Sequence, residues 1–555
     1  MAETIVGGLV YELFKEDKKA VVKKIAPEFK NKTSFTIEEE ISFYKVKYVV
    51  TEIAEKAFYE CRTLASITIP NSVTKVGKDA FYGCSSLTQP VYNEHMFVRL
   101  PASYSGAYTI PDGIKVIANY AFGYCQYLTS ISIPNGVTKV DERAFEGCVS
   151  LTSVIIPDGV TMIGNSMFRY CKGLIDITIP NSVISIGEVA FGDCISLTSI
   201  IIPNSVLYVE AGAFAGCQSL STIALPNSVR SIGHQAFVAC KSLTSITIPD
   251  SVMSINKETF LYCSALTSIT IGKMVRYIEE DAFGGCSSLS SIIVEKGNSK
   301  YDSRNNCNAI IETATNQLIL GCKSTTIPNN IISIGERAFY PCSSPTSITI
   351  PSSVTRIGRR AFSGCKKLES IVVEPANENY DSRDNCNAII ETATNTMLKG
   401  CQNTVIPKSV TSIDDRAFSS CSGLTTITIP NSVRKVGKET FYNCSSLTSV
   451  SIGNGVTSIG EGAFESCKAL SSITIQNTQE NIILEKSIEY SWRNDWISKV
   501  QFVGKTENAK QFKETAAATK KTRSNLDKVK TAPLSSKKQQ EKTSIFKRIK
   551  NIFQK

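Results

Sequence analysis

Histidine is nearly absent from this chain of 555 residues, where His95 and His234 are the only two copies. Sites that pair a nucleophile with histidine, or that bind a metal through several histidines, therefore have almost no residues to use. No apolar run approaches the ~18 residues that a membrane-spanning helix needs, so none is expected. The start, MAETIVGGLVYELF, has neither a basic region nor an apolar core. It therefore does not predict a signal peptide.

Acidic residues are scarce only near the end of the chain. The whole sequence has a formal net charge of +10. Residues 503–555 hold 15 Lys and Arg against 4 Asp and Glu, a net charge of +11, so residues 1–502 are close to neutral. Residues 503–544 also contain few apolar side chains, a composition typical of a disordered linker.

A repeated text of 23 residues fills most of the chain. The copy at Lys241–Cys263, KSLTSITIPDSVMSINKETFLYC, returns at Cys194–Gly216 and at Ser422–Cys444. Polar and isoleucine residues alternate from Ser245 to Thr247, which predicts a short strand with one buried face, and Pro249 then ends it. One copy cannot bury its apolar side alone, so the copies must stack. The sequence predicts a mainly β solenoid: a curved stack with short strands on one side and short helical turns or extended segments on the other.

Cysteine is frequent, with 19 copies, and most recur every 23 residues, as from Cys125 to Cys286. They occupy one position of the repeat, where cysteine behaves as a small buried apolar residue. No pair has the C-x-x-C spacing of a metal site. We expect free buried thiols, with disulfides between stacked copies as the alternative.

The pattern divides the chain into five parts. An atypical cap is expected at an open solenoid end. Leu9–Phe14 and Ala20–Ile25 predict a hairpin within the first cap. The expected parts are an N-terminal β cap (1–50), the solenoid (51–476) with longer modules near 85–120, 287–338 and 366–417, a C-terminal cap (477–502), the basic linker (503–544) and a basic amphipathic segment (545–555).

Two of the longer modules carry near-identical text. Tyr301–Asn316 and Tyr380–Asn395 differ only at Asn305 and Asp384. Both predict a hairpin inserted into one coil. On one interpretation their Asp, Asn and Arg residues satisfy the turn backbone. On the other they form a protruding recognition patch of Asp302, Arg304, Asp381 and Arg383. The text does not match a calcium-binding loop, and no calcium is expected.

The C-terminal end holds two further candidates. Trp492 and Trp496 are four residues apart. On a helix they share one face, which predicts a cap packed on the last coil, with a ligand-stacking platform as the alternative. The last residues alternate apolar and basic side chains at helical spacing, which indicates either contact with a membrane surface or acidic partner, or a tail without function. The candidate contacts are Ile545, Phe546, Lys547, Arg548, Ile549, Lys550 and Phe553.

The repeated text, Ser-Ile-Thr-Ile-Pro-Asn-Ser-Val…Ile-Gly…Ala-Phe…Cys, closely resembles the BspA-like leucine-rich repeat family over roughly residues 50–476. This resemblance implies a surface or secreted protein that adheres to host matrix proteins, to other cells or to other bacteria. It brings no catalytic residues and no cofactor. No catalytic motif stands outside the structural template, so an enzyme is not expected.

The outward strand positions form the candidate partner-binding surface. If the strands line the concave side, that face is broad, nearly uncharged and rich in hydroxyl groups, and many small contacts with a protein or glycan partner add up along it. The plainer interpretation is that Ser and Thr are soluble, strand-compatible residues. The candidates on this face are Ser130, Ser132, Thr178, Ser199, Thr222, Ser245, Thr247, Ser268 and Thr270.

The sequence thus predicts a non-enzymatic interaction protein that binds through the concave face or the hairpin modules. The alternative is an intracellular, membrane-peripheral scaffold tethered by the segment Ile545–Phe553. Nucleic-acid binding is not expected, since nothing resembles a groove-reading module.

Overall fold

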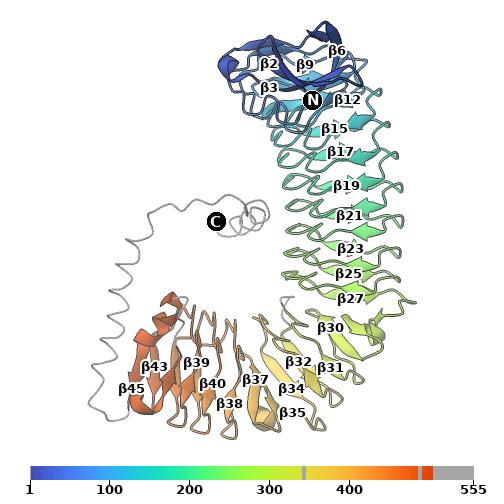
Figure 1. Cartoon of the computed structure of the whole chain (residues 1–555). Coiled ribbons are helices and arrows are strands. Elements are labelled where there is room, and N and C mark those ends of the chain that lie inside the picture. Colours follow the sequence, from blue (N-terminus) through green and yellow to red (C-terminus); the bar gives the residue numbers. More distant parts are fainter. Residues whose placement is uncertain (1, 341–344, 486–490, 504–555) are drawn as a thin grey trace.

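Short parallel strands stacked in register make up most of the molecule, as a computed structural model shows for residues 2–340, 345–485 and 491–503 (Figure 1). Each regular copy contributes one longer strand and one strand of two residues. Strands of successive copies pair in parallel with an offset of one repeat, so that Ser245 lies opposite Ser268 and Ile246 opposite Ile269. The predicted β solenoid is therefore confirmed. Tight turns join its extended segments.

The longer strands form the main ladder. Its members are β7 (Ser66–Thr68), β11 (Ser105–Thr109), β13 (Tyr127–Ser132), β15 (Ser153–Ile155), β17 (Asp176–Thr178), β19 (Ser199–Ile201), β21 (Thr222–Ala224), β23 (Ser245–Thr247), β25 (Ser268–Ile271), β27 (Ser291–Val294), β32 (Ser347–Ile350), β34 (Ser370–Val373), β39 (Thr426–Ile429), β41 (Ser449–Ile452), β43 (Ser472–Ile475) and β45 (Val500–Phe502).

The two-residue strands form a second ladder. Its members are β8 (Lys75–Val76), β12 (Val116–Ile117), β14 (Lys139–Val140), β16 (Met162–Ile163), β18 (Ser185–Ile186), β20 (Tyr208–Val209), β22 (Ser231–Ile232), β24 (Ser254–Ile255), β26 (Tyr277–Ile278), β31 (Ser333–Ile334), β33 (Arg356–Ile357), β38 (Ser412–Ile413), β40 (Lys435–Val436), β42 (Ser458–Ile459) and β44 (Ile483–Leu484).

A column of phenylalanine rings runs through the core between the ladders. From Phe122 to Phe283, the ring centroids of successive copies lie 5.0 to 5.6 Å apart, with nearly parallel planes. Stacking places each Phe on its equivalent in the next copy, so no single copy has to enclose a ring by itself. Burial of such side chains is the main stabilising term, at roughly 1.5–3 kcal/mol each.

The cysteines form a second internal column. All but one of those described are buried, Cys61 being half-buried, and the structure has no disulfide among the residues it describes. The thiol of Cys171 donates to the carbonyl oxygen of Phe145 at 3.1 Å, and Cys194 does the same to Phe168 at 3.1 Å. This bond joins neighbouring copies, so the thiol has a polar role as well as the predicted apolar one.

The N-terminal segment forms a sheet in the order β1 (Ala2–Val6), β2 (Leu9–Phe14), β3 (Lys19–Ile25), β6 (Val46–Ile53) and β5 (Glu40–Phe43), with a short 3-10 helix, η1 (Pro27–Phe29). The predicted hairpin is present as β2–β3. β6 pairs in parallel with β8 of the second ladder, and β4 (Ser34–Thr36) pairs with β7 of the main ladder. The segment therefore covers the first strand edge of both ladders.

Three irregular coils interrupt the stack. The first contains β9 (Val91–Tyr92) and β10 (Met96–Arg99). The other two are the duplicated modules, with the predicted hairpins. Their elements are β28 (Tyr301–Asp302), η2 (Arg304–Asn306), β29 (Ala309–Glu312) and β30 (Gln317–Gly321), then β35 (Tyr380–Asp381), η3 (Arg383–Asn385), β36 (Ala388–Glu391) and β37 (Thr396–Gly400).

The irregular coils also divide the core. The buried apolar residues fall into four clusters, whose boundaries lie at Phe97–Ala118, Cys307–Cys322 and Cys386–Cys401. Each boundary is inside one irregular coil. The stack also changes direction near β30 and β31 (Figure 1).

The C-terminal elements are η4 (Gln479–Asn481), β44, η5 (Ser491–Lys499) and β45. Trp496 is buried, and its ring centroid lies 5.3 Å from that of Phe464, the last ring of the column. Trp496 packs on this ring from a 3-10 helix with three residues per turn, and not from the α-helix that the spacing of the tryptophans implied. The side chain of Trp492 lies outside the described residues.

Candidate functional site

The outward residues of the main ladder form a continuous exposed surface. In the strands β15 to β23 the middle residue is buried and the two flanking residues are exposed. Of the candidates, Ser132, Thr178, Ser199, Thr222, Ser245 and Thr247 are exposed, and Ser130, Ser268 and Thr270 are half-buried. The alternation of one strand therefore becomes two parallel columns of outward side chains along the stack.

A neighbouring row of hydroxyl groups is used by the fold itself. At the residue just before each strand, Ser or Thr donates to the carbonyl oxygen of the equivalent residue one copy earlier, at 2.9 to 3.3 Å. The donors are Thr152, Ser221, Thr244, Thr267, Ser290, Thr448 and Ser471. By contrast, within the described residues the side chains of Ser199, Ser245 and Thr247 make no hydrogen bond to protein atoms. Their hydroxyls are free to meet a partner.

Two aliphatic side chains stand out on the same surface. Ile155 is 70% exposed and Ile201 is 84% exposed, both at the outward end of their strands. Thr178 lies between them in the same column. Single exposed apolar side chains are common on protein surfaces. Ile155 and Ile201 are notable because they lie two copies apart in one column, where a partner that follows the column would cover both. Sequence reasoning placed both in the outward column without selecting them as binding residues. Their size and apolar character were the available signal.

In the duplicated modules, the predicted recognition residues bind one another. Arg304 donates through Nε to Asp302 Oδ1 at 2.8 Å and through Nη1 to Asn316 Oδ1 at 2.7 Å. Arg383 repeats this with Asp381 and Asn395, both at 2.8 Å. The hydrogen bond to the carboxylate raises the pKa of each arginine. These contacts favour the interpretation in which the module's polar residues hold its turns.

The two modules have left-handed backbone at the same positions. Asn305 and Asp384, where the two texts differ, have φ of 58° and 59°, and Asn316 and Asn395 have φ of 53° and 51°. Asn and Asp tolerate this conformation better than other residues with a side chain. The two modules therefore share this backbone conformation, and Asn305 and Asp384 can stand in for one another within it.

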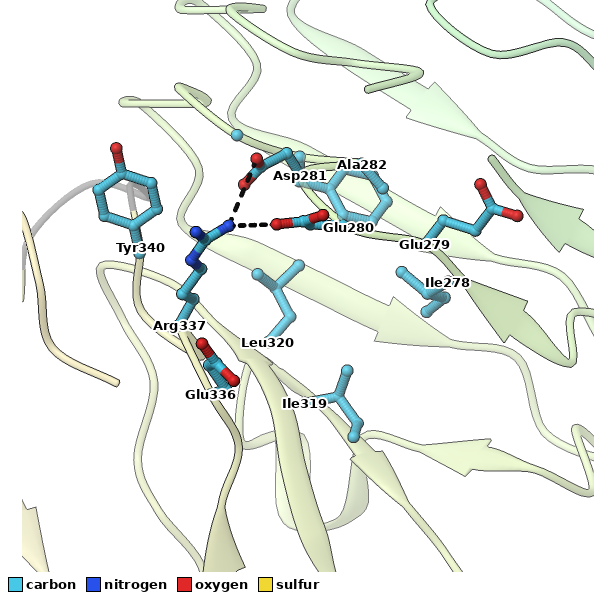
Figure 2. Close-up of a pocket in the computed structure, with 12 residues that line it drawn as sticks. Ile278, Glu279, Glu280, Asp281, Ala282, Ile319, Leu320, Glu336, Arg337 and Tyr340 are labelled. Atoms are coloured by element: carbon cyan, nitrogen blue, oxygen red, sulfur yellow. Dashed lines mark hydrogen bonds and ion pairs between the residues drawn. The ribbon is translucent and has the colours of Figure 1, made fainter. Parts of the chain in front are cut away.

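A cavity of about 330 Å³ opens where the first module interrupts the stack. Figure 2 shows Arg337 reaching across it toward Glu280 and Asp281 of the copy before the module. Arg337 Nη1 lies 2.5 Å from Glu280 Oε1 and 3.6 Å from Asp281 Oδ2. Burial raises the pKa of Asp281. No group of three or more His, Cys, Asp or Glu side chains in the described parts of the chain is arranged to hold a metal.

The buried thiols give the fold a pH dependence. Burial raises the pKa of Cys125 from an ordinary 9.0 to about 11, and that of Cys263 to about 12. The unfolded chain loses these protons first. The stabilising contribution is therefore complete below about pH 9 and is lost as the pH rises toward 11–12.

We expect the free energy of unfolding, measured with denaturant, to fall steadily between pH 9 and 11. A Cys263→Ala variant should fall less steeply over this range, because one coupled proton has been removed. Identical slopes in the two proteins would contradict this origin of the pH dependence.

The candidate residues of the basic tail, from Ile545 to Phe553, lie outside the described residues. In the parts that are described, no helix is long and apolar enough to cross a membrane.

Comparison with known proteins gives a family match over most of the chain. A family of BspA type leucine rich repeat regions, with six copies, matches residues 30–100, 104–217, 184–311, 309–386 and 394–511. No curated protein matches.

Among solved structures, three similar proteins cover most of the chain. A leucine-rich repeat protein from Bacteroides ovatus is 24% identical and covers 87% of this chain and 99% of its own, with a TM-score of 0.45. A leucine rich cell surface protein from Faecalibacterium prausnitzii is 25% identical and covers 87% and 96%, with a TM-score of 0.33. The pneumococcal vaccine antigen PcpA is 17% identical and covers 91% and 99%, with a TM-score of 0.23.

Proposed function

The chain belongs to the BspA type leucine rich repeat family, and from this premise we propose that it is a non-enzymatic adhesion protein of the cell surface. It binds a protein or glycan partner through the outward columns of the main ladder. The partner is an extended one, because many weak contacts along a rigid array add up only when the partner follows the array.

The exposure of Ile155 and Ile201 on this ladder is the observation that carries the proposal. Interfaces draw most of their binding energy from a few apolar or aromatic anchors, surrounded by polar contacts that exclude water. Here two isoleucines are set among free hydroxyl groups, an arrangement that supports this division of roles. In the part of the chain that the structure describes, both isoleucines remain largely exposed.

The test is binding of the full chain to a panel of immobilised extracellular-matrix proteins, including collagen, fibronectin and laminin. For the matrix protein that binds, a variant carrying Ile155→Ser and Ile201→Ser is expected to weaken Kd at least tenfold. Met253→Ser is the matched control, because Met253 is 53% exposed but lies beside the second ladder. Its Kd should stay within about twofold. An equal loss of affinity in the double isoleucine variant and in Met253→Ser would count against the proposal. So would the absence of matrix binding by the unaltered chain.

The alternative function is a membrane-peripheral scaffold tethered by the basic segment. It is favoured by the apolar and basic spacing of Ile545–Phe553 in the sequence. Protease treatment of intact source cells separates the two. Digestion of the chain on intact cells supports adhesion, whereas protection until lysis, together with liposome binding lost on deletion of residues 543–555, supports the scaffold.

A further inference from the structure

The three irregular coils share a shortened connection between the second ladder and the position of the stacked phenylalanine. In a regular copy the stacked phenylalanine is the fifth residue after the last isoleucine of the second ladder, as with Ile255 and Phe260, and Phe260 N donates to Ala282 O. In the irregular coils, the strands β10, β30 and β37 continue directly to the position that the phenylalanine holds in a regular copy. There Gly321 N donates to Ala338 O and Gly400 N donates to Ala417 O. The turn that would fill this place is missing, and a cavity lies between the flanking copies beside β30 and beside β37.

The two duplicated modules line their gaps with opposite charge. The cavity beside β30 is lined by Glu279, Glu280, Asp281 and Glu336 with one arginine, Arg337. The cavity beside β37, of about 90 Å³, is lined instead by Arg359, Arg360, Lys399 and Arg416 with two carboxylates, Asp414 and Asp415. The second cavity therefore has an excess of positive charge.

Lys399 is the most unusual of these residues. It is only 4% exposed, and it occupies the position that the apolar Leu320 holds in the first module. Its nearest polar partner among the described residues is the Cys421 thiol, whose sulfur is 4.0 Å from Nζ. A buried ammonium without a carboxylate is costly, and proteins rarely keep one without a counter-ion. The fold itself does not need a charge at this position, because the first module has the apolar Leu320 there.

Arg360 adds a second cation without a direct ion pair. It is half-buried, and among the described residues its guanidinium makes no hydrogen bond or ion pair. Arg416, by contrast, is paired with Glu439. The pKa of Arg360 is lowered by burial and by the positive charges of Arg416, Arg359 and Arg337. The cationic side chains of the site therefore repel one another as long as no anion lies between them.

We propose that the cavity beside β37 is a binding site for one tetrahedral oxyanion, a phosphate or sulfate group, held by Lys399 and Arg360. Its volume holds several waters or one such group, and not a whole sugar ring. Arginine and lysine together are the usual protein ligands of such groups, because guanidinium and ammonium donate charge-assisted hydrogen bonds to their oxygens. The group arrives either as a free ion or as an ester on a sulfated or phosphorylated glycan. The site uses none of the residues of the main ladder, so it is independent of the proposed adhesion surface.

The test measures binding of sodium phosphate, sodium sulfate and a sulfated oligosaccharide to the full chain, by calorimetry and by thermal shift at constant ionic strength set with sodium chloride. Lys399→Leu copies the first module and is expected to fold, with a Tm without anion equal to or above that of the unaltered chain. It should weaken anion binding at least tenfold. Arg360→Ala should do the same. Arg356→Ala is the matched control, because Arg356 is exposed on the same copy without lining the cavity.

Saturable binding that is lost in Lys399→Leu and kept in Arg356→Ala supports the site. Binding of the inorganic ions identifies a free ion as sufficient, and binding of the oligosaccharide alone identifies an ester. No saturable binding of any probe, equal binding by Lys399→Leu, or an equal loss in Arg356→Ala would overturn the proposal.

Discussion

Replacing Phe237 with aspartate is expected to unfold the coils around β22 and to lower the free energy of unfolding by more than about 5 kcal/mol. The side chain is fully buried, and its ring centroid lies 5.4 Å from both Phe214 and Phe260. Truncating a buried phenylalanine alone costs about 3–5 kcal/mol. Aspartate adds the cost of a carboxylate with no partner in an apolar core.

The loss should spread beyond one copy, because each coil is stabilised mainly by its neighbours. Thermal and denaturant unfolding followed by circular dichroism measures it. Thr247→Asp, at an exposed position of β23, is the control and should change stability by less than about 0.5 kcal/mol. Ile248→Asp should behave like Phe237→Asp, since Ile248 is also fully buried. An unchanged melting curve for either buried variant would show that the inward assignment is wrong.

Gly400→Ala is expected to destabilise the chain by about 2 kcal/mol, a large effect for one methyl group. A Cβ built at this glycine would lie 2.2 Å from Cε1 and 2.4 Å from Cζ of Phe418. The shortened connection has no phenylalanine of its own, and the Phe418 ring fills that space directly over the glycine backbone. Overpacking of this kind typically costs about 1–3 kcal/mol, because ring and backbone must both move.

A double-mutant cycle separates this clash from a general loss of stability. Phe418→Leu removes the ring edge, so Gly400→Ala should cost less in that background than in the unaltered chain. Gly164→Ala is the control, because its nearest neighbour would be at an ordinary contact distance of 3.4 Å. If Gly400→Ala and Gly164→Ala lower the free energy of unfolding equally, the packing of the Phe418 ring does not depend on Gly400.

The repeat period predicted the stack, and the text of the two longer modules predicted the inserted hairpins. The outward position of residues such as Ser245 and Thr247 followed from the alternation of polar and isoleucine residues and is seen in the structure. The role of Gly321 and Gly400 could not be predicted this way, because it depends on a ring about eighteen residues further along the chain. The pairing of Asp302 with Arg304 was also missed, since either residue alone suits a surface patch.

The cationic cavity was hidden from the sequence for a related reason. The sequence around Lys399 is that of an ordinary strand. The lysine becomes unusual only when the structure shows that it is buried at the position that Leu320 holds in the first module. The helical spacing of the tryptophans misled the prediction, because two residues four apart carry no information on whether the helix has 3.6 or three residues per turn.

The four-part core has a mechanical consequence for the adhesion proposed above. Within each part, the stacked rings share load along the axis of the array. At the irregular coils this continuity is broken, and the apolar clusters on either side are separate. Under tension these three coils are where the array should yield first, one section at a time. The chain would then lengthen in steps and absorb work at each step. The remaining sections would stay folded and stay bound to the partner.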